Sequence, residues 1–141
     1  MALPKTPALT TDCVMFDPEG RVLLIRRGHE PYLGQYALPG GFVEIGETVE
    51  AACRREAQEE TGIEVGSLRL VGVYSDPHRD PRGHTASVAF AAVLPRAIQP
   101  RSGSDAASAE WVEDWRKLEV AFDHAKILED AERLIKPRRR D

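Results

Sequence analysis

Four glutamates stand close together in the segment RREAQEETGIE, which spans residues 54–64. Three of them, Glu56, Glu59 and Glu60, lie within five residues. Like charges at helical spacing destabilise a helix by about 0.2–0.5 kcal/mol per pair. Carboxylate oxygens are the ligands that Mg²⁺ and Mn²⁺ prefer, and a bound cation neutralises their repulsion. The cluster therefore indicates a divalent metal site.

A helix over residues 48–61 is expected to position these acids. Thr48 is a good N-cap, and Gly62 suits the C-terminal turn. At about 100° per residue, small and apolar side chains form one stripe, made of Val49, Ala52, Cys53 and Ala57. Glu56 and Glu60 fall inside that stripe, and the third acid lies at its edge. A surface glutamate normally occupies the solvated face, so this placement favours a metal-binding role.

The alternative is a purely structural role for the acids. Arg55 lies four residues before Glu59 and could pair with it, which would leave two solvated acids near the helix end. The preceding loop, LPGGFVEIGET, favours the metal interpretation. Gly40 and Gly41 allow a sharp bend that brings backbone oxygens close to a ligand, and Glu47 could approach the same cation.

From Gly41 to Ile63 the sequence GFVEIGETVEAACRREAQEETGI resembles the Nudix box, GX5EX7REUXEEXGU with U an apolar residue, and every fixed position is filled. The preceding YLGQYALPGG is similar to the family's usual approach to the box, although Tyr36 stands where a tryptophan is common. The resemblance implies an α+β Nudix fold, with a mixed β-sheet sandwiched between α-helices. It also implies hydrolysis of a nucleoside diphosphate linked to another moiety.

The same resemblance implies roles for individual residues. The metal ligands, for Mg²⁺ or Mn²⁺, would be Glu56, Glu59, Glu60, the Gly40 carbonyl and Glu47. The catalytic candidates are Arg55, Glu56, Glu59 and Asp105. Arg55 would fix the geometry by pairing with a box glutamate, and Glu59 is the box candidate for the general base. Asp105 lies where relatives often carry an acid, but it could equally be a solvated loop residue; Ser108 stands where similar proteins often have glutamate.

Downstream segments indicate a substrate. YSDPHRDPRGHTASVAF, which includes Pro77, and AFDHAKILEDA are similar to segments of small ADP-ribose pyrophosphatases. The expected reaction splits ADP-ribose into AMP and ribose 5-phosphate. Four arginines could meet phosphates or ribose hydroxyls, or could equally form an ordinary exposed surface: Arg26, Arg27, Arg79 and Arg82. The four histidines have no metal-ligand spacing.

Two other functions use the same motif. A house-cleaning hydrolase of oxidised nucleoside triphosphates would carry the same box. A non-catalytic nucleotide-sensing regulator usually adds a DNA-binding domain and often loses box carboxylates. The 141 residues are expected to form a single domain, 1–141, which leaves no room for the extra domain, and all box carboxylates are present.

Composition narrows the partners. With 42% hydrophobic, 30% charged and 6% aromatic residues and a net charge of −4, the chain lacks the basic excess of a nucleic-acid binder. It has no apolar run of membrane-spanning length, so we expect a cytoplasmic protein without membrane contact. Cys13 and Cys53 are expected to be reduced core thiols. The family resemblance implies a homodimer that binds a nucleotide.

The periodicity of the sequence predicts the elements that position these residues. Strands are expected over residues 13–16, 21–26, 68–75, 85–94 and 110–112, and helices over 48–61 and 123–135. The turn sequence DPEG predicts an early hairpin. This order favours a mixed sheet with helices packed on it.

Overall fold

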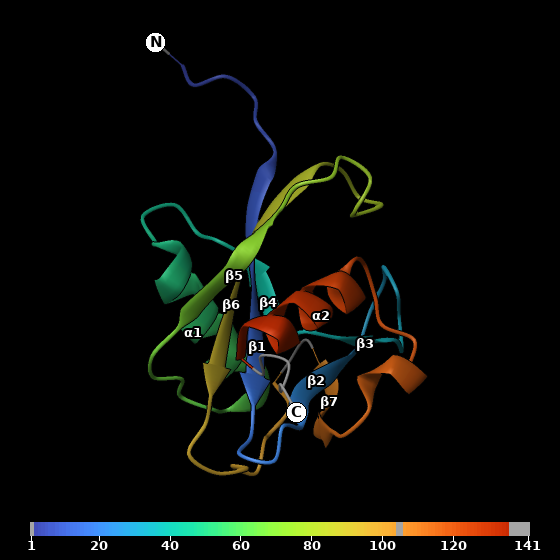
Figure 1. The fold of residues 1–141 in the computed structure, drawn as a ribbon. Coiled ribbons are helices and arrows are strands. Elements are labelled where there is room, and N and C mark those ends of the chain that lie inside the picture. The colour runs from blue at the N-terminus through green and yellow to red at the C-terminus, as the bar shows by residue number, and fades with distance from the viewer. Residues whose placement is uncertain (1, 104–105, 136–141) are drawn as a thin grey trace.

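The computed structural model describes residues 2–103 and 106–135, and in that part of the chain seven strands form one mixed sheet (Figure 1). The strands are β1 (Ala8–Phe16), β2 (Val22–Arg27), β3 (Tyr36–Ala37), β4 (Gly40–Phe42), β5 (Arg69–Tyr74), β6 (Thr85–Val93) and β7 (Ala106–Val112). The helices are α1 (Val49–Thr61), α2 (His124–Ile135) and the short 3₁₀ helix η1 (Trp115–Lys117). The strand order is β3-β2-β1-β6-β5, with β4 paired to β1 and β7 paired to β2.

Strand β1 runs through the middle of the sheet, and its alternate side chains face two different helices. Val14 and Phe16 belong to the apolar cluster that includes α2, whereas Cys13 and Met15 belong to the cluster that includes α1. Figure 1 shows the two helices on opposite faces of the sheet. The expected sheet between helices is therefore confirmed. Cys13 and Cys53 are buried free thiols, as predicted.

The sheet divides along one edge of β1. Strand β6 pairs in parallel with β1 from Ala8 to Phe16 and occupies the other edge. On the dividing edge, β2 pairs with β1 at Phe16, whereas β4 pairs with it over residues 10–12. Because β2 and β4 share this edge at different heights, they separate from each other. A pocket opens at this split.

Most of the expected helices and strands are present, but several begin at residues other than those expected. Strand β1 begins at Ala8 rather than Cys13, and β7 begins at Ala106 rather than residue 110. The hairpin between β1 and β2 is confirmed, because the Asp17 carboxylate accepts bonds from the backbone N–H groups of Glu19 and Arg21. Strands β3 and β4 were not expected, since residues 36–42 lack alternation. Their extended conformation comes from pairing with β2 and β1.

Helix α1 has the predicted caps. The Thr48 side chain accepts a hydrogen bond from the backbone N–H of Ala51, and Gly62 ends the helix in the left-handed region with a φ of 74°. Backbone carbonyls of the last turn are bonded by a later loop. Arg101 N–H donates to the carbonyl of Thr61 at 2.8 Å, and Gly103 N–H donates to that of Glu60 at 3.0 Å. This loop is therefore docked on the C-terminal end of the acidic helix.

A Gly103→Ala substitution tests this docking. A Cβ atom at Gly103 would overlap the backbone carbonyl oxygen of Glu59, which has little freedom to move. We expect the free energy of unfolding to fall by about 1–3 kcal/mol, measured by urea denaturation. The matched control is Gly66→Ala, because a Cβ atom there meets nothing within 4 Å. Equal urea midpoints for the two variants would mean that the loop does not hold this contact in solution.

Candidate active site

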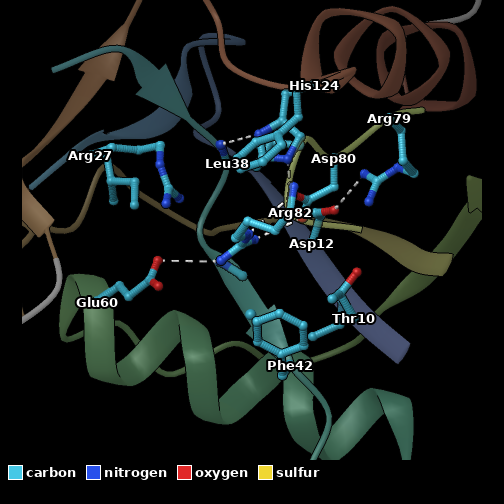
Figure 2. Close-up of a pocket in the computed structure, with 15 residues that line it drawn as sticks. Thr10, Asp12, Arg27, Leu38, Phe42, Glu60, Arg79, Asp80, Arg82 and His124 are labelled. Carbon is cyan, nitrogen blue, oxygen red and sulfur yellow. Dashed lines mark hydrogen bonds and ion pairs between the residues drawn. The ribbon is translucent and has the colours of Figure 1, made fainter. Parts of the chain in front are cut away.

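The pocket at the split of the sheet collects side chains from six parts of the chain (Figure 2). Strands β1, β2 and β4 form its floor and sides, and α1 contributes Glu60. The remaining walls come from Arg79, Asp80 and Arg82 in the loop before β6, and from Phe122 and His124 at the start of α2. Acidic and basic groups thus share one concave site, which is the usual form of a site for a small charged ligand.

Glu60 is the most buried carboxylate of the box. Only 8% of its surface is exposed, and its Oε2 accepts a 3.2 Å hydrogen bond from the backbone N–H of Gly40 (Figure 2). Burial, with the neighbouring charge of Glu56, raises the pKa of Glu60 to about 9. The predicted position on the inward stripe is therefore confirmed. Within the described residues no ion pair reaches this carboxylate, although it interacts at longer range with the charge of Arg27, so a bound cation would relieve an electrostatic penalty.

Arg55 connects the other acids of the box. Its guanidinium makes two bonds to Glu47, at 2.7 and 2.8 Å, and one to Glu56 at 2.7 Å. A longer bond of 3.3 Å reaches Glu59, whose side chain is 59% exposed. The bonds from Arg55 lower the pKa of Glu47 to about 2. Glu47, a candidate metal ligand from the sequence, is thus engaged with Arg55 in this structure.

The donor groups at this end of the pocket suit a hard divalent cation. Burial raises the pKa of Glu56, as it does for Glu60. Gly41 leaves free the space beside Glu56, where a Cβ atom would lie 2.7 Å from the carboxyl carbon. Within residues 2–103 and 106–135, no three acidic, histidine or cysteine side chains already converge on one point. The fit therefore rests on the chemistry of the donors, which are carboxylates and backbone oxygens.

Two of the four candidate arginines present positive charge at the pocket. Arg27 lies over the ring of Phe122, with its Cζ 5.0 Å from the ring centroid. Arg82 lies over Phe42 at 5.3 Å and pairs with Asp80 at 2.8 Å. Burial and the nearby charge of Arg82 lower the pKa of Arg27. Two neighbouring cations of this kind favour an anionic ligand between them.

The other two arginines are placed differently. Arg79 lines the pocket but is buried, and its guanidinium makes two bonds to Asp123, at 2.7 and 2.9 Å, and a third to Thr85. Its donors are therefore largely used within the protein. Arg26 does not line the pocket; it donates to the carbonyl of Gly34. Because successive side chains on a strand point to opposite faces, only one of two adjacent arginines on β2 reaches the pocket.

A buried polar network that the sequence did not reveal closes the back of the pocket. The backbone N–H of Leu38 donates to Nδ1 of His124 at 3.0 Å, and Nε2 of His124 lies 3.2 Å from Oδ1 of Asp12 (Figure 2). Since Nδ1 accepts, the neutral ring carries its proton on Nε2 and donates it to Asp12. Although burial opposes ionisation, His124, Ser87 and Arg79 keep the pKa of Asp12 below its ordinary value. The sequence contained one signal of this network, because Asp12 is an acid within the largely apolar segment TTDCVMF.

The expected loop base is not placed by the structure. Asp105 lies outside the described residues. Ser108 lies in β7, and its buried Oγ has no hydrogen-bond partner among the residues that the structure describes. Neither residue is therefore assigned a chemical role from this geometry.

An α+β sandwich with an acidic helix opening onto an arginine-lined pocket is the architecture that the box motif implies. A family model described as the NUDIX domain matches residues 6–134. The chain therefore belongs to the Nudix hydrolase family.

Individual relatives are similar over most of the chain. An ADP-ribose pyrophosphatase of Methanocaldococcus jannaschii is 44% identical over 124 residues, covering 88% of this chain and 72% of that protein. The ADPR responsive transcriptional repressor NtrR of Acinetobacter baylyi is 32% identical over 133 residues, or 89% of this chain. This chain spans only about half of that repressor, 53%.

A solved structure of similar fold contains a nucleotide. The NUDIX domain of Shewanella oneidensis NrtR, crystallised in complex with ADP ribose, aligns with a TM-score of 0.87 at 26% identity. The alignment covers 94% of this chain and 90% of that domain.

Proposed function

We propose that this protein hydrolyses the pyrophosphate bond of ADP-ribose with water, giving AMP and ribose 5-phosphate, and that it uses Mg²⁺ or Mn²⁺. The observation that carries the proposal is the meeting of the buried box carboxylate of Glu60 with Arg27 and Arg82 at one pocket. The choice of substrate is supported by the 44% identity to an ADP-ribose pyrophosphatase and by the ADP ribose complex of the similar NrtR domain.

The box residues have different roles, which follow from their positions. Glu56, Glu59 and Glu60, with the Gly40 carbonyl, would hold the cation. A bound divalent ion supplies neutralisation of phosphate oxygens and lowers the pKa of water. Arg55 holds Glu56 in place, and its two bonds to Glu47 support a positioning role for Glu47 beside the proposed ligand role.

The other pocket residues bind and orient the substrate. Arg27 and Arg82 carry positive charge at the pocket, where they would pair with phosphate oxygens. Arg79 would act indirectly, because its ion pair with Asp123 holds it in the pocket wall. Glu59 is the most exposed of the three helix acids and remains our candidate for the group that takes a proton from water.

A second candidate function is nucleotide sensing without turnover. The 32% identity to a transcriptional repressor that responds to ADPR favours it. The complete set of box carboxylates favours catalysis instead, because a sensor needs no activated water.

A nucleotide panel tests these functions against each other. The protein is incubated with ADP-ribose, other dinucleotides or oxidised dGTP, each with Mg²⁺, Mn²⁺ or EDTA, and the products are separated by chromatography. We expect AMP and ribose 5-phosphate from ADP-ribose with either metal and no reaction in EDTA. Release of pyrophosphate from oxidised dGTP at a higher kcat/KM would favour the house-cleaning function. Binding of ADP-ribose without turnover of any compound would favour the sensor.

Other expectations from the sequence remain predictions. These are the single domain over residues 1–141, the cytoplasmic location, the homodimer and the absence of nucleic-acid partners. In the part of the chain that the structure describes, no helix is long and apolar enough to cross a membrane.

A further inference from the structure

Thr10 on β1 places a buried hydroxyl at the pocket. The residue is only 9% exposed and lines the pocket, yet its Oγ1 has no hydrogen-bond partner in the described part of the chain. Buried hydroxyl groups are normally bonded, because an unmade bond leaves the cost of removing the group from water uncompensated. An unpaired hydroxyl at the wall of a binding pocket therefore indicates a group that a ligand completes.

Two carboxylates that line the same pocket, those of Asp12 and Asp80, already have partners. Asp12 accepts from the Ser87 hydroxyl through one oxygen and pairs with His124 through the other. Asp80 accepts three bonds from Arg82, at 2.8, 2.9 and 3.1 Å. These two carboxylates are thus already engaged within the protein, and neither bonds to Thr10.

The position of Thr10 fits the far end of an extended substrate. Thr10 pairs across the strands with Phe42, so the two side chains share one face of the sheet. Figure 2 shows Thr10 and Glu60 on opposite sides of Phe42. Arg82 lies above the Phe42 ring. A ligand with its diphosphate beside Glu60 and Arg82 would extend its attached group toward Thr10.

We propose that Oγ1 of Thr10 binds a sugar hydroxyl of the substrate and so selects diphosphates that carry a sugar. The inference rests on the proposed function and names a recognition contact within it. A hydroxyl both donates and accepts, which matches a ribose hydroxyl. The sugar is either the terminal ribose or the ribose of adenosine.

Two variants isolate the hydroxyl. Thr10→Val keeps the branched shape and removes the oxygen, whereas Thr10→Ser keeps the oxygen. We expect Thr10→Val to lower kcat/KM for ADP-ribose by about tenfold, and Thr10→Ser to restore most of the loss. Because the hydroxyl is unpaired in the free protein, Thr10→Val should not lower the thermal midpoint. A merely structural hydroxyl would lower the midpoint and leave kcat/KM for the folded protein unchanged.

Substrate analogues identify the contact. Wild type and Thr10→Val are compared on ADP-ribose, on analogues lacking one hydroxyl of the terminal ribose, and on analogues lacking one hydroxyl of the adenosine ribose. When the contacted hydroxyl is missing from the substrate, the kcat/KM of wild type should fall by about tenfold relative to ADP-ribose. The kcat/KM of Thr10→Val should fall little further, since this variant already lacks the hydrogen bond. Such a non-additive loss for a hydroxyl of either ribose supports the proposal and shows which ribose Thr10 contacts. Equal losses in both proteins for every analogue would overturn it.

Failure of the Thr10 contact can be distinguished from failure of the proposed function. If wild type hydrolyses none of these compounds, the proposed function fails, and the same comparison is made by calorimetric binding of ADP-ribose and its analogues. Weaker binding by Thr10→Val, with coupling to one hydroxyl, would still support the contact. Equal binding by both proteins, or no binding by wild type, would overturn it.

Discussion

A Glu60→Gln variant is expected to hydrolyse ADP-ribose at least about tenfold more slowly than wild type and to need a higher metal concentration. Glutamine keeps the size of the side chain, and its amide oxygen can still accept the bond from Gly40 N–H. Only the negative charge is lost. Because the carboxylate is buried and forms no ion pair within the described residues, its charge is useful mainly to a bound cation. The measurement is kcat against Mg²⁺ and Mn²⁺ concentration.

The matched control is Glu64→Gln, which removes the same charge from an exposed residue just beyond α1. This control should keep the wild-type rate and metal dependence. If Glu60→Gln behaved like Glu64→Gln, the buried acid would be structural, and the proposed metal site would be wrong.

The position of Glu60 could be predicted because it depends on local information. Thr48 and Gly62 determine the ends of α1, and the helical period then determines which acids face the sheet. Nothing distant is needed for that argument. The general arrangement of a sheet between helices could be predicted for the same reason, since it follows from the order and periodicity of elements.

The pocket could not be predicted in this way, because it depends on which strands meet. Residues 40–42 form a strand only because β1 pairs with them, and the pocket exists only because β2 leaves the same edge. The selection among the arginines has the same origin. Arg79 is occupied by Asp123, which lies 44 residues later. The partnership of Asp12 with His124 likewise joins opposite ends of the chain.

The Glu60→Gln substitution should raise the stability of the metal-free protein, although it lowers activity. The pKa of Glu60 is about 9 in the folded protein, compared with an ordinary value of 4.5. Between these values the folded state holds a proton that the unfolded state releases. The contribution of Glu60 to stability is therefore fully present below about pH 4.5 and is lost as the pH rises toward about 9. Glutamine resembles the protonated acid and should keep that contribution at every pH.

In EDTA near pH 7, Glu60→Gln is thus expected to have a free energy of unfolding about 1–3 kcal/mol higher than wild type, measured by urea denaturation. At about pH 4 the difference should nearly disappear. Saturating Mg²⁺ should reduce or reverse the difference at pH 7, because a ligand that binds only the folded state stabilises it, and wild type binds the cation more tightly. A variant less stable than wild type in EDTA at pH 7 would contradict the raised pKa. Persistence of the full difference in saturating Mg²⁺ would contradict the role of Glu60 as a ligand.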